Sequence, residues 1–333
     1  MLKKYSRDES HFLDVHYWLA LKLIPRLSTQ KRLALVSDFG LRELFVNPPA
    51  QCICQLSDAQ YRALISPDWN KITAILDKTN ACGASAIGYS NDAYPTLLRE
   101  IYDPPLVMFV KGEIALLNRA QLAIVGSRNV SYYGKESAYQ FAKEMAEAFV
   151  VVTSGLAIGV DASAHLGSLA GKGHTIAVIA TGIDEVYPTR HKTLAKNILD
   201  NGGLIVSEFM PETPARAGHF PRRNRLISGM SQGVLVIEAA LKSGTLITAK
   251  CALEHNREVF ALPGVIQNSN AAGCHWLIKQ GAKLVDCSAD ILEELVGNPE
   301  IGLHLNKHQQ KQEDHNKSKN KGLCIDPLLA SVG

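Results

Sequence analysis

The sequence has little of what marks an exported or membrane-inserted protein. None of its segments approaches 18 uninterrupted apolar residues, and the N-terminus reaches acidic residues before any apolar run, so we expect no signal peptide and no transmembrane helix. Seven cysteines in 333 residues are an odd, sparse set that does not fit a disulfide framework and favours a reducing compartment. We therefore expect a cytoplasmic protein that does not bind membranes.

The chain also lacks a strong net charge. The 35 Lys and Arg residues exceed the 32 Asp and Glu residues by three, so a polyanionic partner would have to be bound by clustered charge. Hydrophobic residues make up 46% of the chain, which is enough for a core and excludes global disorder. The length predicts about two domains.

Common motifs of catalysis are missing as well. No P-loop, G-x-S-x-G or H-E-x-x-H occurs, the first predicted strand is not followed by G-x-G-x-x-G, and the cysteines lack the paired spacing of zinc sites. Asp161 and His165 stand four residues apart, as acid–base partners can, but their place at a helix start favours a cap and a loop clamp. We expect no catalytic residue, no metal and no cofactor.

Three regions follow from the pattern along the chain. Residues 1–82 predict a helical accessory domain of the SAM or helix-hairpin-helix type, which either contacts nucleic acid or is a plain packing domain. Residues 83–298 predict an α/β domain. Residues 299–333 predict a disordered, Lys-rich tail, because 307–321 contain five Lys, two acids and no apolar residue.

A doubly wound, mostly parallel sheet is expected for the α/β domain. Short apolar runs alternate there with amphipathic segments, which is typical of parallel strands covered by helices on both faces. The expected strands are 122–126, 150–153, 175–180, 204–207, 234–237, 258–261 and 283–285. The expected helices lie near 135–149, 160–171, 191–201, 222–231, 245–255 and 273–280.

Glycine, serine and threonine follow several of these strands. Because the carboxyl ends of parallel strands meet at one edge of a sheet, these residues are expected to form anion cradles for a ligand that carries phosphate. The segments are Gly126-Ser127-Arg128, Ser154-Gly155-Leu156-Ala157, Thr181-Gly182, Ser207-Glu208 and Ser243-Gly244-Thr245.

The strongest local signal is the run from His219 to Arg225. No acidic residue occurs between Glu212 and Glu238, and this window contains four arginines beside Phe220. Such a group suits a phosphodiester backbone and a stacked base. The alternatives are a core role for Phe220 and a structural network in which arginines pair with acids. We expect both uses of the arginines, with two of them facing solvent. The arginines are Arg216, Arg222, Arg223 and Arg225, and the candidate acids are Asp184, Glu208 and Glu238.

The ordered motifs of the chain resemble those of the bacterial DNA-processing protein A family (DprA, also called Smf). They include AIVGSRNVSYYG, VVTSGLAIGVDASAH, HFPRRNRLISG and GCHWLIKQGAKLV, within a match from about Tyr94 to about Leu295. The resemblance implies a Rossmann-like fold and binding of single-stranded DNA without strong sequence preference. It further implies protection of incoming strands, loading of the RecA recombinase during natural transformation, and homodimers, with no established turnover.

The same resemblance assigns a DNA pocket to residues of this chain. It covers Gly126, Ser127, Arg128, Phe220 and the segment Arg222-Arg223-Asn224-Arg225, and it places basic contacts at Arg190 or Lys192 and near Arg216. With the cradle residues Ser154, Gly155, Ser243, Gly244 and Thr245, these make up the predicted DNA-binding set. The winged-helix domain that ends many relatives is expected to be absent or truncated.

The alternative function is that of a nucleotide-processing hydrolase. Phosphoribohydrolases of similar architecture carry P-G-G-x-G-T-x-x-E, whereas residues 242–247 of this chain read KSGTLI. Because the glycine run and the carboxylate are missing, the sequence favours binding over catalysis.

Overall fold

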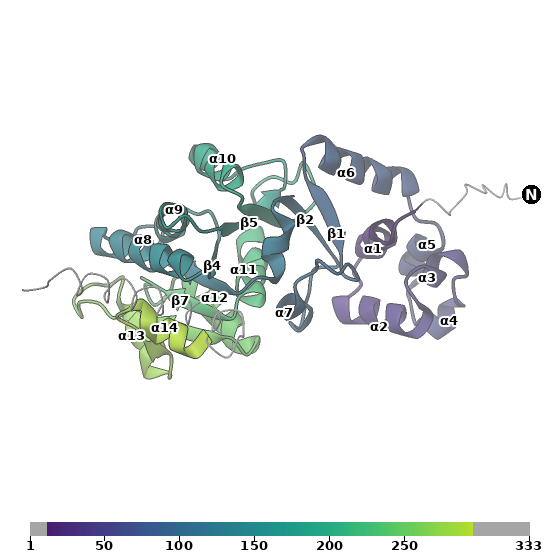
Figure 1. Ribbon diagram of the computed structural model, residues 1–333. Coiled ribbons are helices and arrows are strands. Elements are labelled where there is room, and N and C mark those ends of the chain that lie inside the picture. Colours follow the sequence, from purple (N-terminus) through teal and green to yellow (C-terminus); the bar gives the residue numbers. More distant parts are fainter. Residues whose placement is uncertain (1–11, 296–333) are drawn as a thin grey trace, which may run out of the picture.

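One nine-stranded sheet has the strand order β1-β2-β6-β5-β4-β3-β7-β8-β9. Figure 1 shows the sheet with helices packed around it. The computed structural model describes residues 12–295, and the predicted tail lies outside them. The strands are β1 (Ser85–Gly88), β2 (Val107–Gly112), β3 (Gln121–Val125), β4 (Val151–Ser154), β5 (Thr175–Gly182), β6 (Leu204–Phe209), β7 (Gly233–Val236), β8 (Glu258–Ala261) and β9 (Lys283–Leu284). The α/β class and the seven expected strands are confirmed.

Strands β1 and β2 were not expected from the sequence. They pair with each other in antiparallel fashion, and β2 pairs in the same way with β6, so the sheet is parallel only from β6 to β9. Antiparallel neighbours need no crossover helix. The strand–helix alternation that located the other strands therefore could not locate these two.

The helices are α1 (Asp14–Leu23), α2 (Thr29–Phe39), α3 (Glu43–Val46), α4 (Gln51–Cys54), α5 (Asp58–Ile65), α6 (Trp69–Ala81), α7 (Thr96–Arg99), α8 (Tyr132–Glu147), α9 (Val160–Ala170), α10 (Lys192–Asp200), α11 (His219–Met230), α12 (Gly244–Glu254), α13 (Ala272–Lys279) and α14 (Ser288–Leu295). Residues 12–295 also contain the short 3-10 helices η2 (Ile114–Asn118) and η3 (Thr189–His191). All six helices expected in the α/β region are confirmed.

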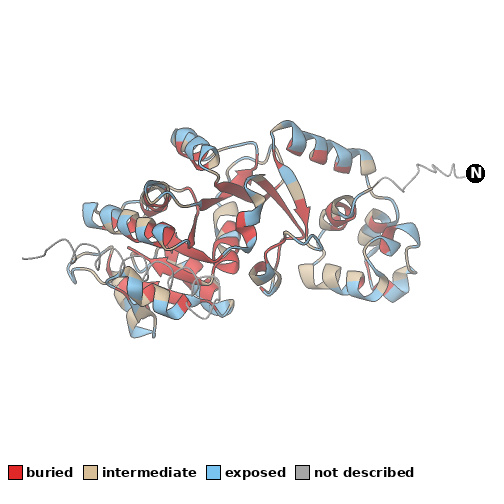
Figure 2. Ribbon diagram, viewed as in Figure 1, coloured by how far each residue is buried: buried red, intermediate tan, exposed pale blue. Residues whose placement is uncertain are grey.

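Alternating side chains of the central strands pack against different helical layers. On β3, Leu122 and Ile124 contact the cluster of α8, α9 and α14, whereas Ala123 and Val125 contact that of α7, α11 and α12. Figure 2 shows the strands as the most continuously buried part of the molecule. Both faces of the sheet are thus covered, as the continuous apolar strands require.

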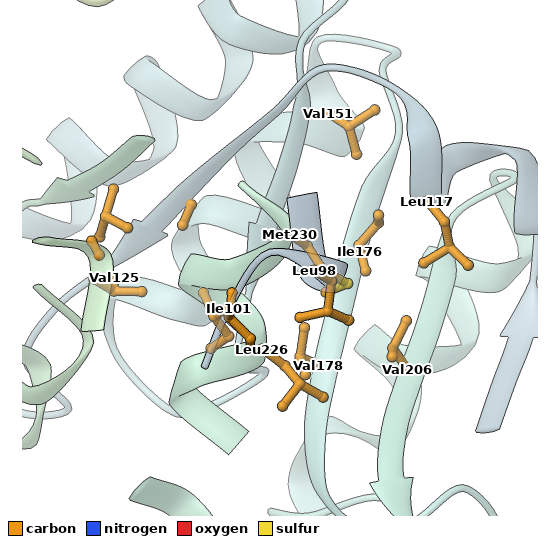
Figure 3. Close-up of a cluster of buried hydrophobic side chains, with 14 of the residues drawn as sticks. Leu98, Ile101, Leu117, Val125, Val151, Ile176, Val178, Val206, Leu226 and Met230 are labelled. Atoms are coloured by element: carbon orange, nitrogen blue, oxygen red, sulfur yellow. The ribbon is translucent and has the colours of Figure 1, made fainter. Parts of the chain in front are cut away.

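Helix α11 is held by the second of these layers. Figure 3 shows its Leu226 and Met230 beside Leu98 and Ile101, which belong to α7 and the segment after it, over valines of the sheet. A Cβ added at Gly229 of α11 would lie 2.8 Å from Leu98, so this helix approaches α7 closely. This packing holds the C-terminal half of α11, and the arginine-rich run begins at the other end of the helix.

The N-terminal helices share their core with the sheet. Tyr17, Trp18 and Leu21 of α1 belong to the same buried cluster as Phe109 of β2 and Ile205 of β6, and α1 lies beside β1 (Figure 1). Helix α5 begins with a capping box formed by Ser57 and Gln60. The predicted boundary between residues 82 and 83 lies between the helical region and the first strand, but the apolar core is continuous across it. Among residues 12–295, no helix has both the length and the apolar character needed to cross a bilayer.

We predict that Trp18→Ala destabilises the whole protein. The Trp18 side chain is 2% exposed, and its Nε1 donates to Ser90 Oγ at 2.9 Å. Loss of so large a buried ring costs about 3–5 kcal/mol. Urea unfolding should show one transition shifted to lower denaturant, while Tyr102→Ala, at a side chain that is 82% exposed, should leave it in place. Two separate transitions in the Trp18 variant would contradict the shared core.

Candidate functional site

A cavity of about 390 Å³ opens at the carboxyl end of β3, between the N-terminal ends of α11 and α12. The strand delivers the loop after Val125, and the two helices deliver their first turns. This is the position at which parallel sheets bind ligands. Nine residues of the predicted set line the cavity: Gly126, Ser127, Arg128, Phe220, Arg223, Asn224, Ser243, Gly244 and Thr245.

A smaller hollow of about 90 Å³ adjoins this cavity and shares Arg128, Phe220 and Arg223 with it. It brings in Gly155 and Arg190 from the predicted set. It also brings in Tyr187, which the sequence reasoning did not single out, although an aromatic residue three positions before Arg190 was a usable signal. The two hollows meet at the ring of Phe220.

The Phe220 ring contacts both Arg128 and Tyr187 at this junction. The Arg128 guanidinium lies over the Phe220 ring, with Cζ 5.1 Å from the ring centroid, and the Tyr187 ring is 5.8 Å from that of Phe220. Arg128 is exposed, and no carboxylate of residues 12–295 lies within ion-pair distance of it. A guanidinium that stacks on a ring keeps its N–H groups at the edge, where they can donate to phosphate oxygens.

The Arg223 side chain is turned into the protein, which argues against the expectation that it holds phosphate directly. It is 5% exposed, and its Nη1 donates to the carbonyl oxygens of Gly155 and Val178, each at 2.5 Å. Burial lowers the pKa of Arg223 to about 10, against the opposing effect of Asp161, so the group stays charged at neutral pH. Its Nη1 holds the backbone just after β4 and within β5 instead of facing outward.

Arg225 is also withdrawn from the cavity. Its Nη2 donates to Glu208 Oε1 at 2.6 Å and its Nε lies 3.3 Å from Asp103 Oδ2, with 12% of the side chain exposed. Arg222 remains 60% exposed, with Nη2 3.6 Å from the same Glu208 oxygen. The expected pairing of arginines with Glu208 is confirmed, and so is the expectation of two outward-facing arginines, Arg216 and Arg222.

Three further predicted residues do not line either hollow. Ser154 is 0% exposed and donates its hydroxyl to Ile124 O at 2.7 Å, so its side chain cannot reach a ligand. Lys192 and Arg216 are exposed, the first at the start of α10 and the second just before α11. These two cations lie outside the lining of the site.

Two glycines of the cradles are needed for packing. A Cβ on Gly126 would lie 2.5 Å from Val160 of α9, and one on Gly155 would lie 2.3 Å from Arg223 Nη1. The space beside them is therefore taken by the protein itself. At Gly244, in contrast, no atom of the described structure lies within 4 Å of such a Cβ, so the first turn of α12 faces open space.

Asp161 acts as the expected loop clamp. Its Oδ2 accepts from the amides of Gly155 at 3.1 Å and Ala157 at 3.3 Å, opposite the Arg223 guanidinium. Among the described residues that line the cavity, Asp161 is the one carboxylate. Oδ2 of this carboxylate is thus occupied by backbone amides of the loop after β4.

His165 lies on helix α9, one turn after Asp161, and burial holds it neutral. Thr175 Oγ1 donates its single proton to Val152 O at 2.6 Å and therefore accepts from His165 Nδ1 at 2.7 Å. Burial lowers the pKa of His165 to about 3. The side chain is fully buried and supports the fold, which confirms the structural interpretation of the Asp161 and His165 pair.

The chain matches a family model described as DNA recombination-mediator protein A over residues 85–296. It is 46% identical to Protein Smf of Escherichia coli strain K12, over 73% of this chain and 64% of that protein, and thus spans slightly under two thirds of the relative's length. It is 42% identical to DNA processing protein DprA of Bacillus subtilis strain 168, over 72% of this chain and 81% of that protein.

Two solved structures are similar in fold. The X-ray structure of DprA from Streptococcus pneumoniae has a TM-score of 0.73 and 36% identity, over 84% of this chain and 97% of that one. The structure of DprA from Helicobacter pylori, described as showing a single-stranded DNA binding mode, has a TM-score of 0.58 and 29% identity, over 64% of this chain and 96% of that one.

We predict that His165 makes the fold acid-sensitive. Because the folded-state pKa lies below that of the unfolded chain, the unfolded chain takes up the proton first, and stability is lost as the pH falls from about 6.5 toward 3. Between pH 7 and pH 5 this loss amounts to about 2 kcal/mol. Urea unfolding of His165→Gln at both pH values should show a drop smaller by that amount, and an equal drop would refute the assignment.

Proposed function

Because the chain belongs to the DNA recombination-mediator protein A family, whose relatives are named DprA or Smf, we propose that it binds single-stranded DNA at the cavity around Arg128. The observation that carries the proposal is the exposed Arg128 guanidinium stacked on Phe220 at the mouth of a cavity of about 390 Å³. A cation and a ring side by side match the alternation of phosphate and base along a single strand.

The described residues divide between direct contacts and support. Arg128 holds a phosphate, Phe220 stacks a base, and the open first turn of α12 at Gly244 offers backbone donors and a helix dipole to a second phosphate. Arg223 and Arg225 hold the loops and helix α11 in place through their buried partners. The other exposed cations near the site form its outer, screened field: Arg190, Lys192, Arg216 and Arg222.

The cellular role is part of the same proposal. The relatives are DNA-processing proteins, and the family model describes a recombination mediator. We infer that the bound strand is protected and passed to the RecA recombinase during natural transformation. The homodimer and the cytoplasmic location stay predictions.

We predict that Arg128→Ala weakens binding of oligo-dT and flattens its salt dependence. One phosphate contact fewer reduces the slope of log K against log salt by about 0.7 to 1. Fluorescence anisotropy across a salt series measures both quantities. Arg62→Ala, at an exposed arginine of α5 in the N-terminal region, is the matched control and should change neither.

Phe220→Ala should weaken binding without changing the salt slope, because a stacked ring contributes about 1–3 kcal/mol and carries no charge. At fixed salt the loss corresponds to about 5- to 150-fold in affinity. Unchanged affinity in both the Arg128 and the Phe220 variants would show that the strand binds elsewhere.

RecA recruitment is tested by pull-down with and without single-stranded DNA. We expect wild-type protein to retain RecA, and to deposit it on a strand faster than RecA loads alone. If RecA is never retained and loading is unchanged, the protein coats DNA without mediating the exchange.

A further inference from the structure

An aromatic and apolar surface begins next to the proposed DNA site and has no described function. Tyr132 and Tyr133 open helix α8 with 84% and 57% of their side chains exposed. Val265 and Ile266, in the loop after β8, are 67% and 82% exposed. Tyr133 and Val265 both line a hollow of about 450 Å³, so the two segments enclose one space.

This hollow is joined to the Arg128 cavity by a single loop. Residues Arg128 and Asn129 line the cavity, while Ser131 and Tyr133, a few positions later, line the hollow. Asn270 lies between the lining residues Asn268 and Ala271 and donates its Nδ2 to Asn129 O at 2.9 Å. This hydrogen bond connects that side of the hollow to the same loop. A flexible chain that leaves Arg128 in this direction meets the tyrosines next.

The chemistry of the hollow suits bases better than phosphates. Its one charged residue among the described lining is Glu238, which is 3% exposed and has both oxygens occupied at the start of α8. Oε2 accepts from Ser131 N at 2.9 Å, and Oε1 accepts from Ser131 Oγ at 2.5 Å. The carboxylate therefore neutralises the positive end of the helix, which leaves a surface without free charge.

We propose that the bound single strand continues from Arg128 across Tyr132 and into this hollow, where Tyr133 stacks a further base. The inference rests on the proposed function and extends it from one nucleotide cradle to a longer path. Rings accept any base through their faces, so the extension adds affinity without sequence preference. It also places the extra affinity in a part of the site that salt does not weaken.

The test compares wild-type full-length chain with the double variant Tyr132→Ala/Tyr133→Ala on oligo-dT of increasing length. On the shortest oligomer that the wild type binds, we expect equal affinity. On longer oligomers the variant should bind about tenfold or more weakly, with the salt slope unchanged. Tyr102→Ala, which removes an exposed tyrosine in the segment after α7, is the matched control and should behave as the wild type at every length.

Two single variants guard against a folding defect. Tyr132→Ala alters a side chain that is 84% exposed and should reproduce part of the loss, and Tyr133→Phe keeps the ring and should bind as the wild type. Equal binding of the double variant at all lengths, or an equal loss at all lengths, would overturn the extended path.

A change in oligomeric state of the double variant, measured by sedimentation velocity, would instead identify the patch as a contact between copies of the chain and would also overturn the path. If the wild type binds no oligo-dT of any length, the proposed function itself fails. If the wild type binds and only the length dependence is missing, the present inference alone fails.

Discussion

The buried Arg223 guanidinium is the interaction on which the rest of the site depends. It connects the backbone at the end of β4 and within β5 through two carbonyl oxygens, and it faces Asp161, which in turn holds two amides of the β4–α9 loop. Helix α11 carries Arg223, so the same contacts fix the position of Phe220 three residues earlier. A charge buried in this way is tolerated because Nε and Nη1 donate to protein oxygens and Asp161 lies nearby, and removing a partner would leave the charge uncompensated.

A consequence is that the arginine-rich run has two electrostatic roles. Arg223 and Arg225 turn inward toward carbonyl groups and Glu208, whereas Arg222 stays exposed beside the same Glu208 oxygen. Arg128, outside the run, is exposed over the Phe220 ring. Arg223 and Arg225 fix the geometry of the site, and Arg128 and Arg222 supply positive charge at its surface. The inward-turned groups are already locked by their partners, so they would not have to reorganise if the proposed strand binds.

The N-terminal helices contribute to the same framework. Lys22 of α1 donates its Nζ to Glu208 O at 2.7 Å, next to the carboxylate that pairs with Arg225. Burial lowers the pKa of Lys22 to about 8. The helical region thus contacts the strand that positions α11, and its apolar residues complete the core on that side of the sheet.

Much of the molecule follows from the order of residues alone. Apolar runs with helical segments between them are sufficient to predict the parallel strands, and the clustering of small residues after those strands is sufficient to place the cradle at one edge, because strand direction decides where loops meet. The antiparallel strands β1 and β2 were not predicted, because no crossover helix marks them in the sequence. Only the tertiary structure decides which arginine is buried and which is exposed. Arg222, Arg223 and Arg225 are nearly adjacent in sequence, but a helix turns successive residues by about 100°, and the sheet lies on one side of α11 only. The local sequence determines where the arginines are concentrated. Packing between segments far apart in the chain determines which of their side chains face the interior and which face the surface.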